Sequence, residues 1–134
     1  MKKIHISRRF KEVVLLTIIY SVITNVLLLI LARIYAGAPS TFSPFMYWPV
    51  ISLTTAGVIV AAFVYVFIGL FTKNQNKIFL SVATVALFLS FIPDLMLFHP
   101  VDPEDFGATP AIIAILMLMH VLTAWIVVYM FTEK

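Results

Sequence analysis

The hydrophobic residues of this chain fall into four long blocks, separated by short polar or proline-rich connections. The blocks cover approximately residues 13–32, 50–71, 78–98 and 111–131. Each is long enough to cross a hydrocarbon layer about 30 Å thick, which takes about 20 residues of helix. The pattern predicts an all-α fold, an antiparallel four-helix transmembrane bundle, in which residues 1–134 form a single membrane domain.

Composition supports a membrane setting. The chain is 63% hydrophobic and only 11% charged, whereas about a quarter of the residues in a soluble domain are charged. It contains no cysteine, which excludes disulfides, thiolate metal sites and catalytic thiols. We therefore expect an integral membrane protein without a separate soluble domain.

The basic residues are distributed unevenly around the four blocks. Eight of the nine lysines and arginines lie before the first block, between the second and third, or at the end: Lys2, Lys3, Arg8, Arg9, Lys11, Lys73, Lys77 and Lys134. Arg33 alone lies on the opposite side. By the positive-inside rule, both termini are expected in the cytoplasm and the acidic 99–109 loop outside. The basic residues are thus orientation signals, and we expect no nucleic-acid partner.

A few polar residues interrupt the blocks. Asp94 is the only acid and His120 the only histidine inside them. A charged side chain at the centre of a membrane helix costs about 2.5–3.5 kcal/mol or more, so it usually has a partner or a function. Ser90 lies one turn before Asp94. Asn25 shares a helix face with Thr17 and Ser21, and this face is expected to point into the bundle. The candidate ligand-binding residues are Asn25, Arg33, Thr54, Ser90, Asp94 and His120.

Depths in the bilayer follow from a helix rise of about 1.5 Å per residue. Counted from the cytoplasmic edge, Asn25, Ser90 and His120 come to about 16–18 Å, near the bilayer middle. Asp94 comes to about 24 Å, beneath Arg33, and about 8 Å from the level of His120. The sequence leaves open whether Asp94 contacts Arg33 or His120.

Three further features carry predictions about packing. The connection at 34–49 contains three prolines, and its aromatic residues are typical of an interfacial belt; the alternative is a lid over a cavity that opens outward. In the second block, Thr54, Gly57 and Ala61 form a ridge of small residues, which predicts close helix packing. Pro93 removes a hydrogen bond to Leu89 and predicts an opened turn in the third block.

Two short motifs, Ser90-Phe-Ile-Pro-Asp94 and Met117-Leu-Met-His120, support a resemblance. At these motifs the chain resembles a family of small bacterial four-helix integral membrane proteins of unassigned function. The resemblance implies a bacterial plasma membrane and the same four spans. It implies no activity and no catalytic residue.

The leading hypothesis is a non-enzymatic membrane protein that binds a small or lipidic ligand in an outward-facing polar cavity within the membrane. One alternative is a structural or accessory subunit whose polar residues hold the helices together, and another is a proton-coupled exporter that uses Asp94 and His120. An enzyme has the least support, although these two residues would form an acid–base pair if adjacent. We expect no cofactor or metal. The expected partners are membrane lipids and a hydrophobic small molecule, and a homodimer remains open.

Overall fold

The computed structural model describes residues 8–99 and 108–133, and in these residues the fold is all-α. The elements are α1 (Arg8–Tyr35), the short 3-10 helix η1 (Ser43–Phe45), α2 (Tyr47–Phe71), α3 (Gln75–Met96) and α4 (Pro110–Thr132). All four long helices are long and apolar enough to cross a membrane. The predicted four-helix fold is confirmed. The predictions for Lys2, Lys3, Lys134 and residues 100–107 of the acidic loop lie outside the described residues.

The helices begin and end close to the predicted blocks, and local chemistry explains several ends. Thr109 caps α4, since its hydroxyl accepts a hydrogen bond from the Ile112 amide, and Pro110 occupies the first helical position. Pro49 is tolerated in the first turn of α2, where its missing N–H would have no partner within the helix. Pro93 lies within α3, which nevertheless continues to Met96.

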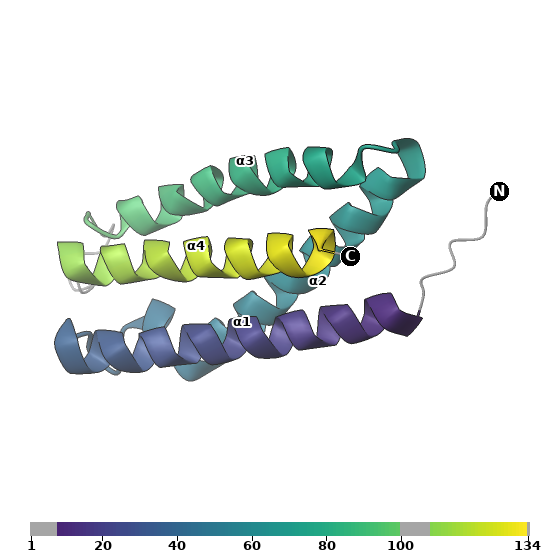
Figure 1. Ribbon diagram of the computed structural model, residues 1–134. Coiled ribbons are helices and arrows are strands. Elements are labelled where there is room, and N and C mark those ends of the chain that lie inside the picture. The colour runs from purple at the N-terminus through teal and green to yellow at the C-terminus, as the bar shows by residue number, and fades with distance from the viewer. Residues whose placement is uncertain (1–7, 100–107, 134) are drawn as a thin grey trace.

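The four helices alternate in direction. The start of α1, the end of α4 and the α2–α3 turn lie at one end of the bundle, as Figure 1 shows. Helix α1 packs along both α2 and α4, and α3 packs along α4. Helices α2 and α3 contact each other less, and they diverge with distance from their shared turn (Figure 1).

Helix α1 buries one narrow stripe. Thr17, Ser21, Asn25, Leu29 and Ala32 are its buried residues, and their spacing places them on one face. Lipid offers no hydrogen bonds, so polar side chains on a membrane helix are expected to face the protein interior. The prediction that the Thr17–Ser21–Asn25 face points into the bundle is confirmed.

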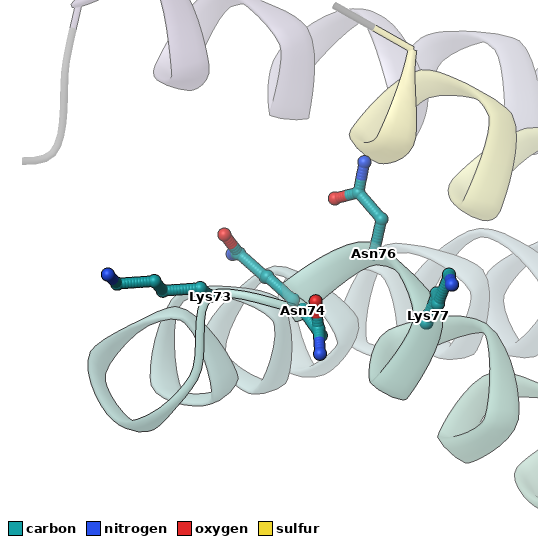
Figure 2. Close-up of a pocket in the computed structure, with 5 residues that line it drawn as sticks. Lys73, Asn74, Asn76 and Lys77 are labelled. Carbon is teal, nitrogen blue, oxygen red and sulfur yellow. The ribbon is translucent and has the colours of Figure 1, made fainter.

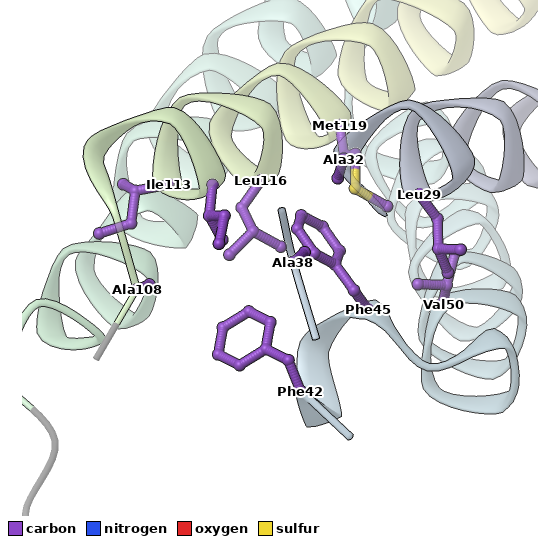
Figure 3. Packing of buried hydrophobic residues seen from close by; sticks show 11 residues of the cluster. Leu29, Ala32, Ala38, Phe42, Phe45, Val50, Ala108, Ile113, Leu116 and Met119 are labelled. Atoms are coloured by element: carbon purple, nitrogen blue, oxygen red, sulfur yellow. The ribbon is translucent and has the colours of Figure 1, made fainter. Parts of the chain in front are cut away.

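The connection between α1 and α2 packs into the end of the bundle. Phe42 and Phe45 are buried, and Phe45 is 0% exposed. They belong to a cluster that also contains residues of α1, α2 and α4 (Figure 3). Tyr47 and Trp48 are exposed, as an interfacial belt requires. The belt interpretation is therefore wrong for Phe42 and Phe45, because the connection folds inward and buries both rings.

A second cluster closes the opposite end. The rings of Tyr65, Phe79 and Phe131 contact one another there. The Tyr65 hydroxyl donates to Asn76 Oδ1 over 2.9 Å, and Asn76 Nδ2 donates to the Thr132 carbonyl over 3.1 Å. Figure 2 shows Asn76 pointing from the start of α3 toward the end of α4. These contacts fix the end where α2 and α3 meet, so the two helices are free to separate only farther along.

Candidate functional site

A cavity of about 650 Å³ lies where α2 and α3 diverge. Its lining runs along α2 from Pro49 to Val64, sixteen residues that span about 22 Å of helix. Ligand cavities in proteins typically measure about 300–1,000 Å³. Several wall residues are themselves exposed, with Leu53 at 71% and Val60 at 60%. The cavity is therefore a groove between α2 and α3 that opens sideways, through the apolar surface of the bundle.

This geometry differs from the outward-facing cavity expected from the sequence. The groove extends from Pro44 and Pro49 at one end to Phe79 and Val127 at the other. It thus follows most of the bundle length. The sequence-based picture placed the opening at the end of the bundle, and that end is filled by the inward-packed connection containing Phe45.

Small side chains account for the space. Gly57 on α2 and Ala83, Ala86 and Ser90 on α3 all line the groove. A Cβ atom added at Gly57 would meet no atom within 4 Å. The prediction that Gly57 permits close helix packing is therefore wrong, because here the small residue widens a gap instead of allowing a contact.

Asp94 and His120 meet at the side of the groove formed by α3 and α4. His120 Nδ1 lies 3.1 Å from Asp94 Oδ2 and 3.0 Å from the Leu116 carbonyl of its own helix. One N–H on this nitrogen would have two competing acceptors. Asp94 Oδ2 has no well-directed hydrogen bond to any residue that the structure describes. The Asp94 side chain is 8% exposed and that of His120 40%, so His120 is the more open of the two toward the groove.

The direction of the side chains explains why these residues touch despite an expected 8 Å difference in level. Helical side chains point toward the N-terminus of their own helix. Because α3 and α4 are antiparallel, Asp94 and His120 point toward each other along the bundle. The bond of His120 to Leu116, one turn earlier, is consistent with this direction. The structure thus answers the open question in favour of His120.

A second polar group connects three helices. Asn25 Nδ2 donates to Thr54 Oγ1 over 2.9 Å and to Thr123 Oγ1 over 3.0 Å. We call these three residues the amide cluster, and all three line the groove. Asn25 Oδ1 is buried and has no hydrogen-bond partner among the described residues. Sequence reasoning omitted Thr123 from the site, although its position three residues after His120 places both on one helix face.

The other two predicted residues differ in position. Ser90 lines the groove, and its hydroxyl donates to the Leu87 carbonyl over 2.7 Å. Arg33 does not line the groove. Its Nη2 donates to the Phe45 carbonyl over 2.7 Å, and its guanidinium carbon lies 4.8 Å from the centre of the Tyr47 ring. Five of the six predicted residues are thus brought to one groove, and Arg33 instead supports the α1–α2 connection.

Comparison with known proteins gives one match. A family model described as a family of unknown function, DUF6069, matches residues 5–134. The chain belongs to the DUF6069 family. No curated protein and no solved structure matches it. The expectation of an uncharacterised family is confirmed, while the two short motifs and a bacterial origin stay predictions. DUF6069 membership assigns no chemistry, so function has to be argued from the groove.

The groove limits the chemistry that this DUF6069 protein could perform. In the described ranges, no group of three His, Cys, Asp or Glu side chains gathers as a metal site. The polar atoms are a carboxylate–imidazole pair, a serine hydroxyl and the amide cluster, all beside an otherwise apolar wall. The groove thus combines a compact polar region with a long apolar wall along α2 and α3.

Proposed function

We propose that the protein binds a single-chain amphiphile, a small or lipidic molecule, in the groove between α2 and α3. The ligand enters sideways from the hydrocarbon layer. Its polar head lies at Asp94 and His120, beside Ser90 and the amide cluster, and its chain follows the apolar walls. The observation that carries the proposal is one groove of about 650 Å³ that combines a long apolar wall with a compact polar region.

The membrane placement belongs to the same proposal. Four helices in the described residues are long and apolar enough to cross a membrane, which supports a multi-pass membrane protein. We place it in the plasma membrane, with the termini and the α2–α3 turn in the cytoplasm. Lys73 and Lys77 flank that turn and support this orientation by the positive-inside rule. Membrane lipids are then the surrounding solvent and the nearest source of ligand.

Native mass spectrometry of the gently purified protein tests the proposal. The informative variant is Gly57→Leu, because a side chain at this position enters open space in the groove. The matched control is Ala56→Leu, which enlarges the neighbouring, exposed residue that does not line the groove. We expect an amphiphile on the wild type and on Ala56→Leu, and none on Gly57→Leu. The same spectra also distinguish a monomer from a homodimer.

The outcome that contradicts the proposal is equally clear. If the wild type carries no amphiphile, even after decylamine, decanol or decanoate is added, the groove does not bind ligand. The accessory-subunit alternative would then be favoured, with the polar residues acting only between helices. Equal binding by both leucine variants would place the ligand elsewhere on the surface.

A proton-coupled exporter is the second candidate, favoured by the 3.1 Å contact between Asp94 and His120 inside a groove open to lipid. In this case the ligand would be moved across the membrane and not only held. Reconstituted vesicles with an imposed pH gradient distinguish the two. Gradient-driven uptake that disappears in Asp94→Asn would support export, and binding without uptake would exclude it.

A further inference from the structure

We propose that the head of the ligand is an alkylammonium group, so that the groove selects long-chain primary amines over alcohols and carboxylates of equal chain length. This inference rests on the proposed binding function and adds the chemical class of the ligand. It follows from which polar atoms of the groove are already used and which are free.

The free atoms are mainly acceptors. Asn25 Oδ1 and Asp94 Oδ2 are both buried and lack a well-directed hydrogen bond in the described structure. Ser90 gives its hydroxyl hydrogen to the Leu87 carbonyl, which leaves its oxygen lone pairs available. Buried polar atoms in proteins are nearly always hydrogen-bonded, and each exception calls for an explanation such as an absent ligand or water. The unsatisfied acceptors here call for a donor.

The nearby donors are largely committed. Both hydrogens of the Asn25 amide point to the hydroxyls of Thr54 and Thr123. His120 Nδ1 lies between the Leu116 carbonyl and the Asp94 carboxylate, so a hydrogen there is shared. The two threonine hydroxyls each retain one hydrogen and can turn toward a ligand, but they are uncharged. The groove therefore lacks donors more than acceptors.

Charge separates an amine from other donors. Among the residues that the structure describes, Asp94 is the only carboxylate that lines the groove, and no lysine or arginine lines it. Arg33, which the sequence suggested as a partner, is committed to the Phe45 carbonyl and the Tyr47 ring. Within residues 8–99 and 108–133, the imidazole of His120 is then the only titratable neighbour of Asp94 within ion-pair distance. An ammonium head supplies three N–H donors and one positive charge, whereas a carboxylate head would add a second negative group beside Asp94.

The experiment compares decylamine, decanol and decanoate in nanodiscs of zwitterionic lipid, at equal mole fraction in the membrane. Bound amphiphile is counted by native mass spectrometry for the wild type and for Asp94→Asn. The matched control is Thr84→Val, which removes a hydroxyl from the exposed face of α3, outside the groove. For each amphiphile, the bound amount on a variant is divided by the bound amount on the wild type. This ratio cancels differences in how strongly the three amphiphiles partition into the membrane.

Of the three amphiphiles, we expect decylamine to show the highest occupancy on the wild type. The affinity for decylamine should fall about tenfold or more in Asp94→Asn, as the loss of a charge-assisted hydrogen bond implies. Decanol should change less than about twofold in that variant, and Thr84→Val should match the wild type throughout. If Asp94→Asn does not fold, the ranking of the three amphiphiles on the wild type decides, with Asp94→Glu expected to keep the amine preference.

Failure of this inference is distinguishable from failure of the proposed function. Equal binding of decylamine and decanol, with both lost in Gly57→Leu, would refute the ammonium head and leave groove binding intact. Preferred binding of decanoate would also refute it. Binding of none of the three would refute both.

Discussion

The substitution Asn25→Leu separates a ligand site from a helix clamp, because the same residue would serve in either role. Leucine has nearly the shape of asparagine and no polar atoms. The change removes two interhelical hydrogen bonds, of 2.9 and 3.0 Å, to Thr54 and Thr123. It also removes Oδ1, a buried acceptor without a partner. These two effects have opposite signs.

The two magnitudes are comparable. Hydrogen bonds between membrane helices average about 0.6 kcal/mol each, so two are worth about 1.2 kcal/mol. Leaving a buried acceptor unpaired costs about 1–3 kcal/mol, and this cost disappears with the amide. We therefore expect the free energy of unfolding of the ligand-free protein to stay about the same or to rise by up to about 2 kcal/mol. Ser21→Ala, one turn earlier on the same buried face, should be neutral or slightly stabilising, because the Ser21 hydroxyl oxygen also lacks a partner in the described part of the chain.

The assay is reversible unfolding in mixed micelles, with and without decylamine. A ligand at a hundred times its dissociation constant stabilises a protein by about 2.7 kcal/mol. We expect this increment in the wild type and in Ser21→Ala, and a clearly smaller one in Asn25→Leu. A loss of more than about 3 kcal/mol without ligand, with no change in the ligand increment, would refute the reasoning and identify Asn25 as a clamp.

Three further predictions concern positions that the structure distinguishes. Gly57→Ala should preserve or raise stability, since alanine is favoured over glycine in helices by about 1 kcal/mol. Gly69→Ala should gain less, because a Cβ there would lie 2.8 Å from the Gln75 side chain and displace its hydrogen bond to the Tyr65 carbonyl. Thermal unfolding of the pair tests this, and equal melting temperatures would contradict it. Arg33→Gln should weaken the α1–α2 connection and increase proteolysis there. The affinity for decylamine should stay within about twofold of the wild type, because Arg33 does not line the groove. A large loss of affinity would show that Arg33 does contribute to binding. Tyr65→Phe removes the 2.9 Å hydrogen bond to Asn76 Oδ1 and should lower the free energy of unfolding by about 1 kcal/mol, as denaturant unfolding would measure. An unchanged free energy of unfolding would show that this bond does not hold the ends of α2 and α3 together.

Much of the fold is predictable because hydrocarbon imposes a simple rule on sequence. Helices must be long and apolar to cross it, and polar residues on them must face inward. These rules correctly gave the four helices and the buried face that carries Asn25. The inward packing of Phe45 was not predictable, because Phe45 and the exposed Trp48 suit an interfacial belt equally well by residue type.

The site was predictable as a set of residues and less so as a geometry. Rarity alone singled out Asp94 and His120, since polar groups are costly inside membrane helices. Their contact depends on side-chain direction in antiparallel helices, which a count of residue levels leaves out. The groove depends on how far α2 and α3 diverge, and a glycine such as Gly57 is equally consistent with close packing and with open space.

The central claim is that an amphiphile occupies the groove between α2 and α3, and photo-crosslinking tests it most directly. A decylamine derivative with a diazirine in its chain is irradiated with the protein in nanodiscs, and the adducts are mapped by tandem mass spectrometry. The account predicts adducts on the groove walls at Val60 and Ala86, abolished by excess unlabelled decylamine. Adducts on the exposed outer face of α3, such as at Val85 and Phe88, should persist unchanged. A map in which groove and outer face are labelled equally, and in which decylamine protects neither, would contradict the account.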